Sequence, residues 1–339
     1  VKARKHFDLE ESEQPYFQAE ILVKNTIPLE FIKNIENFGI SIPSKPKALQ
    51  SKNAYTAQIT RNTPTAFIFL VDQSVSMKRM TTLNGEKITL AEAVARIVNK
   101  QIKDLIYRCI KTDEIRHYYD IAVIGYGHEA YSGWNGALLD KDFVSPEELK
   151  NNPYKKIIVN EAVKTRKGVQ IKEVEQIQWL EARCDGNWTH LHKAFEKAKE
   201  LLDTWMTKHH DKDCYPPTII NITDGAFNHA TKEQLIQQAN ELKALFTNDG
   251  NLLLWNIHVT PENGSKILFP THKEELNGNA YAELLYDMSS LLPSKFNDSI
   301  SALKGCPNDK PYTAMSTNVD MSTLIHLMDI GTPTNINQN

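Results

Sequence analysis

The sequence predicts an α/β fold, namely a doubly wound, mostly parallel sheet with one antiparallel edge strand and helices on both faces. Two observations indicate this class. From Thr65 onward, apolar segments of strand length alternate with long segments whose apolar residues recur at helical spacing, which is typical of a parallel sheet covered on both faces. In addition, the first strand segment is apolar throughout, as expected for a strand that is buried on both sides.

The composition excludes several other classes of protein. Of the 339 residues, 41% are hydrophobic and 24% are charged, so the chain is neither a disordered protein nor a disulfide scaffold. Its length corresponds to about two domains, or to one large domain with insertions. The 39 Lys and Arg residues against 42 Asp and Glu give a formal charge of -3, which provides no excess positive field for binding nucleic acid.

We expect a cytoplasmic protein without a membrane span. No apolar run approaches the roughly 18 residues of a transmembrane helix, and residues 1–20 are charged throughout instead of containing an apolar signal-peptide core. The cysteines lie far apart without a CxxC pair, which predicts free thiols in a reducing compartment. They are Cys109, Cys184, Cys214 and Cys306.

The domain organisation follows from where the regular alternation begins and ends. Residues 1–62 show no sustained helical period and contain several prolines, so we predict an N-terminal arm there. Residues 63–333 form the predicted main domain. Within it, residues 137–180 have no single period and are predicted to be an insertion with some strand content. Residues 334–339 are predicted to be a short C-terminal tail.

The first half of the main domain is predicted from apolar runs and from a capping motif. Ala66–Val71 is an uninterrupted apolar run and is expected to be a central strand. A capping box that begins at Thr89 precedes apolar residues at helical spacing as far as Cys109, which predicts a helix. Tyr119–Tyr126 has the pattern of a second strand, and Glu129–Trp134 follows so tightly that it is expected to pair with it in antiparallel orientation.

The second half repeats the alternation. Apolar residues on one helical face extend from just after Thr189 to Trp205, and the strand Thr218–Thr223 follows a pair of prolines. Thr231 caps a further helix whose buried stripe is expected to end at Phe246. The remaining expected elements are a strand at Leu252–Val259, a helix at Ala280–Leu292, an edge strand near Tyr312–Met315 and a last helix at Met321–Ile330.

Three polar loops lie at the ends of these elements. The first contains Asp72, Ser74 and Ser76 directly after the first strand, the second leads to Thr189 before a helix, and the third begins with Asp224 after a strand. Loops at the carboxyl ends of strands converge where the strand order of a doubly wound sheet reverses, so we expect the three loops to meet. They offer carboxylates and hydroxyls but no thiol or neighbouring imidazole. That ligand set suits a hard cation such as Mg²⁺, Mn²⁺ or Ca²⁺.

The D-x-S-x-S of Asp72, Ser74 and Ser76, together with Thr189 and the Thr-Asp-Gly that contains Asp224, resembles the metal-ion-dependent adhesion site (MIDAS) of von Willebrand factor A (VWA) domains. The resemblance covers about residues 65–331. It implies that Ser74 and Ser76 bind the ion directly and that Thr189 does so in one of two states. It also implies that Asp72 and Asp224 bind the ion directly or through water.

The sequence departs from the family pattern at two places. Val75 stands where the family commonly has glycine, and Asn187-Trp188 stands where a second glycine and a smaller residue are common. Other stretches, notably WLEARCDGNWT and NVDMSTLIHLMDIGT, resemble intracellular bacterial members of the family.

A cation held next to neutral hydroxyls is under-compensated in charge, so its vacant position attracts a carboxylate from another protein. Trp188, Asn187 and His190 surround the proposed ligand Thr189 and are expected to contact that partner. We therefore expect a metal-dependent protein–protein interaction module, not an enzyme. The resemblance suggests an intracellular multi-protein system, for instance beside an ATPase, a kinase and phosphatase pair, or a stress- or phage-response complex.

Two alternatives remain open. A hard cation with an open position also polarises phosphoryl oxygens, which would make the chain a metal-dependent phosphoester hydrolase. The metal could instead only stabilise the loops of a structural subunit. The sequence has no GxSxG elbow, HExxH motif, Walker loop or Cys/His nucleophile pair, so it shows no agent of catalysis.

Overall fold

The computed structural model describes residues 54–112, 114–165, 168–225, 227–261, 265–305, 311–332 and 336. Most of the predicted N-terminal arm, residue Cys306 and the predicted tail apart from residue 336 lie outside these ranges. All of the elements below belong to the unit Ala48–Asn339.

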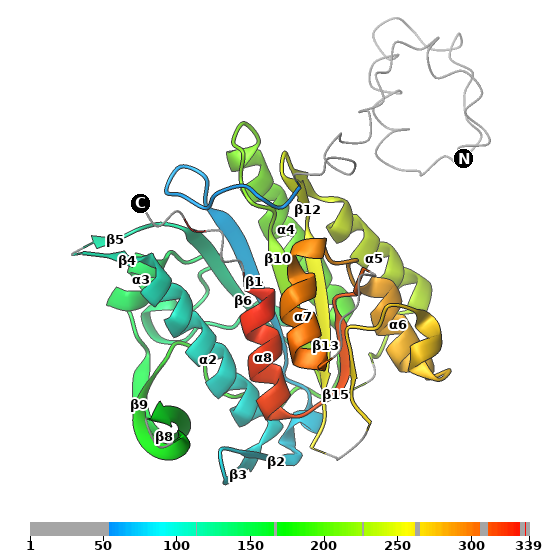
Figure 1. Ribbon diagram of the computed structural model, residues 1–339, viewed down its shortest axis with the longest axis horizontal. Coiled ribbons are helices and arrows are strands. Elements are labelled where there is room, and N and C mark those ends of the chain that lie inside the picture. Colours follow the sequence, from blue (N-terminus) through cyan, green and yellow to red (C-terminus); the bar gives the residue numbers. More distant parts are fainter. Residues whose placement is uncertain are drawn as a thin grey trace, which may run out of the picture. The chain divides into compact units, whose positions relative to one another are not determined.

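A seven-stranded sheet forms the centre of the described part of the chain (Figure 1). Its order is β14-β15-β13-β10-β1-β6-β7, in which the five inner strands are parallel. The two edge strands β14 and β7 are both antiparallel to their neighbours. The predicted doubly wound class is therefore confirmed, with an antiparallel strand at each edge and not at one. The strands are β1 (Thr65–Asp72), β6 (Tyr119–Tyr126), β7 (Ala130–Ser132), β10 (Thr218–Thr223), β13 (Leu253–Val259), β14 (Ile267–Leu268) and β15 (Met315–Val319).

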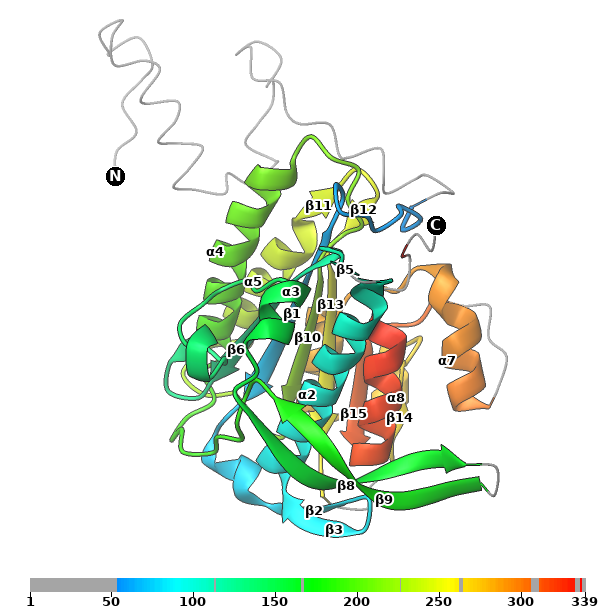
Figure 2. The same cartoon turned by 90° about the vertical axis from the view of Figure 1, so that its left-hand side faces the viewer.

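Helices cover both faces of the sheet because successive side chains of each inner strand point to opposite sides (Figure 2). On β1, Phe67 and Phe69 pack into one core, whereas Ile68 and Leu70 pack into the other. The first core is closed by α2 (Leu90–Cys109), α3 (Pro146–Asn151), α7 (Asn297–Lys304) and α8 (Met321–Gly331). The second is closed by α4 (Leu191–His209), α5 (Lys232–Ala244) and α6 (Ala280–Met288).

Several helices begin at the capping residues that the sequence indicated. The hydroxyl of Thr89 accepts a hydrogen bond from the N–H of Glu92 (3.1 Å) at the start of α2. The hydroxyl of Thr231 accepts one from the N–H of Gln234 (3.1 Å) at the start of α5. Such bonds satisfy main-chain donors that have no partner within the first turn of a helix.

Three predicted elements were wrong in their extent. The helix predicted at Ala280–Leu292 is α6, which ends at Met288. Phe246 does not continue the buried stripe of α5, because α5 ends at Ala244 and Phe246 lies 47% exposed in the short strand β11 (Phe246–Thr247). The strand predicted at Tyr312–Met315 is β15, which begins only at Met315 and lies inside the sheet. The residue before it bonds in two directions: the carbonyl of Ala314 accepts from the N–H of Asn256 on β13 (2.9 Å), whereas its N–H donates to the carbonyl of Ser290 (2.8 Å) in the loop after α6.

The region predicted as an insertion holds a long antiparallel hairpin, β8 (Lys155–Thr165) and β9 (Gly168–Gln178). The hairpin lies against α2 and the hairpin formed by β2 (Met80–Leu83) and β3 (Glu86–Thr89), as Figure 2 shows. The amide of Asn84 donates to the carbonyl of Asn160 (2.8 Å) across this contact. The other short elements are η5 (Val75–Lys78), β4 (Ile110–Lys111), β5 (Glu114–Ile115), η6 (Gly136–Leu138), β12 (Gly250–Asn251), η7 (Lys273–Leu276) and η8 (Ser294–Phe296).

The topology places two carboxylates at one point of the sheet. After β1 the chain forms β6 on one side of it, and β10 later pairs with the other side of β1. The strand order therefore reverses between β1 and β10, where doubly wound sheets bind ligands at the carboxyl ends of their strands. Asp72 ends β1 and Asp224 follows β10 directly. Within the described ranges, no helix is long and apolar enough to cross a membrane.

Candidate metal centre

Asp72 is the most buried acidic group of the candidate site, with no exposed surface. Its Oδ1 accepts a hydrogen bond from the main-chain N–H of Ser74 (2.9 Å), and its Oδ2 accepts one from the hydroxyl of Thr223 (2.6 Å). Burial raises the pKa of Asp72 to about 6, because a carboxylate out of water loses hydration that neutral donors only partly replace. No basic side chain in the described part of the chain pairs with this carboxylate.

The two serines connect the first loop to the end of β10. The hydroxyls of Ser74 and Ser76 lie 2.8 Å apart, and the hydroxyl of Ser76 donates to Oδ1 of Asp224 (2.6 Å). The other carboxylate oxygen of Asp224 accepts from Nη2 of Arg79 (3.0 Å). The structure therefore brings Asp72, Ser74, Ser76 and Asp224 together as predicted, and it adds Arg79 and Thr223 to them.

The loop that carries Thr189 packs on the first loop through main-chain contacts. The carbonyl of Gly186 accepts from the N–H of Val75 (2.8 Å), and the N–H of Gly186 donates to the carbonyl of Gln73 (3.1 Å). A Cβ on Gly186 would lie 2.9 Å from the Cα of Gly127, so only glycine allows this close approach. The position of the loop thus depends on a glycine in each of two distant segments.

Thr189 lies on this docked loop and is buried. Its N–H donates to Oδ1 of Asn228 (3.0 Å), and its carbonyl accepts from the N–H of Asn228 (3.1 Å). Among the described residues, its hydroxyl makes no hydrogen bond to the serines or the two aspartates. Thr189 is therefore held by Asn228 and stands beside the hydrogen-bonded cluster without being part of it.

The residues predicted to contact a partner differ in solvent exposure. Asn187 is exposed and Trp188 is 42% exposed, whereas His190 is only 6% exposed. The Trp188 ring packs edge-on against His229, with 4.5 Å between ring centroids. Nδ1 of His190 lies 2.8 Å from the carbonyl of His128, and its ring lies 4.9 Å from that of His229. The buried ring of His190 thus packs beneath the exposed rings of Trp188 and His229.

An imidazole does neighbour the acidic cluster, contrary to the prediction from the three loops. His258 of β13 pairs with Thr223 in the sheet register, and its ring hydrogen-bonds the main chain of Asp224. Burial lowers the pKa of His258, which favours the neutral ring. Its Nδ1 lies 3.1 Å from the hydroxyl of Thr317, so neighbouring groups fix its orientation. The sequence could have located His258 near the site, because this residue lies at the carboxyl end of the strand predicted at Leu252–Val259.

The oxygen atoms at this point fit a hard cation. Two carboxylates and the hydroxyls of Ser74 and Ser76 converge, and no basic side chain of the described residues pairs with the buried carboxylate of Asp72. Oxygen donors of this kind suit Mg²⁺, Mn²⁺ or Ca²⁺ better than zinc or copper. In the part of the chain that the structure describes, no three side chains of His, Cys, Asp or Glu gather as a metal-binding group, so serine hydroxyls would have to complete the ligand set.

The parallel sheet, its switch point between β1 and β10 and the D-x-S-x-S loop at that point make this a VWA-like fold. No protein-family model matches the chain, and no curated protein matches it. The similar solved structures include a von Willebrand factor type A protein from Catenulispora acidiphila, with 11% identity, a TM-score of 0.34 and coverage of 58% of this chain and 34% of that one.

A second similar protein is proximal thread matrix protein 1 from the mussel byssus, with 13% identity, a TM-score of 0.42 and coverage of 81% of this chain and 48% of that one. Another structure of that protein, described as having a zinc-occupied MIDAS motif, shows 12% identity and a TM-score of 0.39 with the same coverage, 81% and 48%. The chain thus spans about a third to a half of the length of these proteins. The likeness concerns the fold alone.

Proposed function

We propose that the chain is a metal-dependent protein–protein interaction module that binds a carboxylate of a partner protein through a divalent cation, with Mg²⁺ as the expected ion. The observation that supports this most strongly is the state of Asp72. It is a buried carboxylate at the switch point of the sheet whose hydrogen-bond donors among the described residues are neutral, and its pKa is raised to about 6. A divalent cation would remove the cost of keeping it ionised.

The chain's own groups have distinct roles in this proposal. Asp72 provides buried negative charge, and Ser74 and Ser76 present neutral hydroxyls on the loop that follows it. Ser76 is exposed as a residue, so the loop that carries its hydroxyl can be approached from solvent. When bound, the cation supplies an attractive charge that this ligand set only partly compensates.

Exposed apolar side chains around the site favour a protein as the partner. Val75, Met80 and Trp188 are each exposed by 42% or more, and each belongs to a loop or strand that carries or follows a candidate ligand. Large exposed apolar side chains beside a polar site are typical of protein interfaces, where aromatic residues carry much of the binding energy. We propose that Trp188 and Asn187 contact the partner and that His190 positions Trp188.

We also propose that the chain works in the cytoplasm, within a multi-protein system of the kind named above. The free thiols of Cys109, Cys184 and Cys214, of which the first and last are buried, support a reducing compartment. We propose a bacterial origin for the chain because the two stretches quoted earlier resemble intracellular bacterial VWA proteins. An ATPase or a kinase and phosphatase pair remains the proposed class of partner.

Metal-dependent hydrolysis is the main competing function, and the position of His258 bears on it. A general base needs a free lone pair near the reacting water. The ring of His258 is instead engaged by Thr317, Asn318 and the main chain of Asp224, which suits a role in holding the loop. We therefore propose that the protein has no hydrolase activity.

A capture experiment tests the proposal directly. Immobilised wild-type protein would be exposed to extract of its native host with Mg²⁺ or with EDTA, in parallel with the Ser74→Ala/Ser76→Ala double variant. The proposal expects a partner that is retained only by the wild type and only with metal. Turnover of a generic phosphoester that needs metal and is lost in Asp224→Ala would instead support the hydrolase. Equal retention in EDTA would support a structural metal.

A further inference from the structure

Asp224 has no free carboxylate oxygen in this structure. Its Oδ1 accepts from the hydroxyl of Ser76 (2.6 Å), and its Oδ2 accepts from Nη2 of Arg79 (3.0 Å). The same nitrogen donates to the main-chain carbonyl of Asp224 (2.9 Å). The guanidinium of Arg79 therefore holds both the side chain and the main chain of a proposed metal ligand.

The two aspartates of the site differ in their partners. Within the described ranges Asp72 has neutral donors only, whereas Asp224 forms an ion pair with Arg79. The side chain of Asp224 has no exposed surface, so its charge depends on these internal contacts. Arg79 is thus a cation that the chain itself brings to the candidate metal centre.

The main chain of Arg79 is fixed, but its side chain reaches solvent. Its carbonyl accepts a hydrogen bond from the N–H of Leu90 (2.8 Å) at the start of α2, which anchors the backbone. Its side chain is 40% exposed, so side-chain rotation alone can move the guanidinium into water. Release of Asp224 would therefore require no rearrangement of η5 or of the sheet.

We propose that Arg79 is the internal counter-ion of the metal centre: it neutralises Asp224 in the metal-free protein, must release Oδ2 for that oxygen to face a cation, and so lowers the affinity for metal. This inference rests on the proposed metal site. Its physical basis is that a guanidinium and a divalent cation compete for one carboxylate and repel each other at short range. Removing the guanidinium leaves the carboxylate of Asp224 with the hydroxyl of Ser76 as its one donor among the described residues, which makes an external cation more favourable.

The test measures Mn²⁺ affinity by isothermal titration calorimetry in the full chain. Arg79→Gln should bind Mn²⁺ about tenfold more tightly than the wild type, since one nearby positive charge is removed. Arg79→Met, which also lacks the charge and keeps an unbranched side chain, should show the same increase. Arg79→Lys keeps the charge and should stay close to the wild type, which a merely structural role for the guanidinium fork would not predict.

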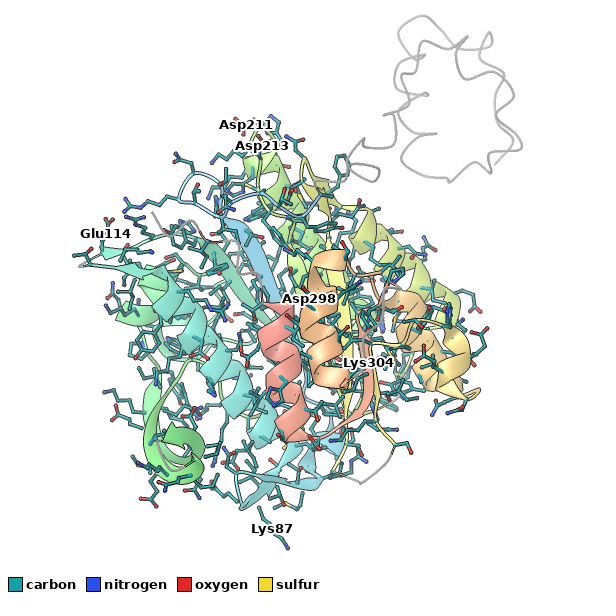
Figure 3. All side chains as sticks on the ribbon, in the orientation of Figure 1. Lys87, Glu114, Asp211, Asp213, Asp298 and Lys304 are labelled. Atoms are coloured by element: carbon teal, nitrogen blue, oxygen red, sulfur yellow. The ribbon has the colours of Figure 1, made fainter. Side chains whose placement is uncertain are left out.

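Lys87→Gln is the matched control. Lys87 lies on the exposed hairpin β2–β3 that follows Arg79, and its side chain points away from the body of the protein (Figure 3). This variant removes the same charge without touching Asp224, so its Mn²⁺ affinity should stay within about twofold of the wild type.

The outcomes separate this inference from the proposed function. If the wild type binds Mn²⁺ and neither neutral Arg79 variant binds it more tightly, Arg79 is not a competing counter-ion, although the metal site stands. If neither the wild type nor the neutral variants bind Mn²⁺, both ideas are wrong. Binding by the neutral variants with little or none by the wild type would be the strongest support for the inference.

Discussion

Replacing Asp72 by asparagine is expected to stabilise the metal-free protein and to abolish its response to metal. The pKa of Asp72 is raised from 3.8 to about 6 in the folded protein, chiefly by burial. The folded state therefore disfavours the ionised group, and at neutral pH this corresponds to a cost of up to about 3 kcal/mol. Asparagine is neutral and of similar shape, so Asp72→Asn should recover part of this free energy of unfolding.

The sign of the pH dependence follows from the same shift. An acid whose folded pKa is raised stabilises the fold most below its unfolded pKa, and this stability is lost as the pH rises from about 4 to about 6. The melting temperature of Asp72→Asn in EDTA should exceed that of the wild type by several degrees at about pH 7.5, on the order of 5–10 °C at most. The difference should shrink toward about pH 4.5.

Metal should stabilise the wild type and not the Asp72→Asn variant. A ligand at a hundred times its dissociation constant stabilises the folded state by about 2.7 kcal/mol, so Mn²⁺ should raise the melting temperature of the wild type. Asp72→Asn lacks the buried charge and should show no rise. Differential scanning calorimetry in EDTA and in Mn²⁺ measures both effects.

Asp120→Asn is the matched control for this experiment. Asp120 is also a buried carboxylate, but it pairs with His117 (2.7 Å) and Trp205 (2.8 Å) far from the site. Burial opposes its ionisation, yet these hydrogen bonds hold its pKa below the ordinary value. Asp120→Asn should therefore destabilise the protein in EDTA and keep the Mn²⁺ response. A lower melting temperature of Asp72→Asn in EDTA, or a Mn²⁺ response that it retains, would refute the reasoning.

Three further perturbations probe other parts of the account. Ser74→Ala with Ser76→Ala should remove the Mn²⁺-induced rise in melting temperature and leave the circular dichroism unchanged, because these hydroxyls bond within the site; a retained rise would contradict their role as ligands. Trp188→Ala should leave Mn²⁺ affinity unchanged and weaken partner capture, with a stability change of about 0.5 kcal/mol or less, since the ring is 42% exposed; undiminished capture would place the interface elsewhere. His117→Gln should destabilise the protein more at about pH 6 than at about pH 8.5, as measured by urea unfolding. The hydrogen bond with Asp120 raises the pKa of His117, and this contribution is lost as the pH rises through the raised value; a pH-independent difference would exclude the pair.

The sequence predicted the acidic centre of the site because two general rules sufficed. Apolar runs locate the ends of β1 and β10, and the topology of doubly wound sheets brings such ends together. The hydrogen bond from Ser76 to Asp224 joins residues 148 positions apart, yet both lie where those rules place them. The helices α2 and α5 were predictable for a similar reason, since their first turns carry local capping signals.

Other features depend on contacts that no local pattern encodes. Arg79 lies in a polar stretch without a motif, and only the folded chain shows that it reaches Asp224. His258 comes to the site through the pairing of β13 with β10. The start of β15 was misplaced because the N–H of Ala314 donates to the carbonyl of Ser290 outside the sheet, although its own carbonyl accepts from the N–H of Asn256 on β13. In these three cases, contacts between residues distant in sequence determine the position of the residue or strand.

Crystals grown with Mn²⁺ test the central claim most directly, through the anomalous signal of the ion. The account predicts a single strong peak between the ends of β1 and β10, about 2–2.5 Å from the hydroxyls of Ser74 and Ser76, with Asp72 and Asp224 beside it or bridged to it by water. It also predicts that the guanidinium of Arg79 no longer contacts Oδ2 of Asp224. A well-ordered site without a peak, with the hydrogen bonds among Ser76, Asp224 and Arg79 intact at saturating Mn²⁺, would contradict it.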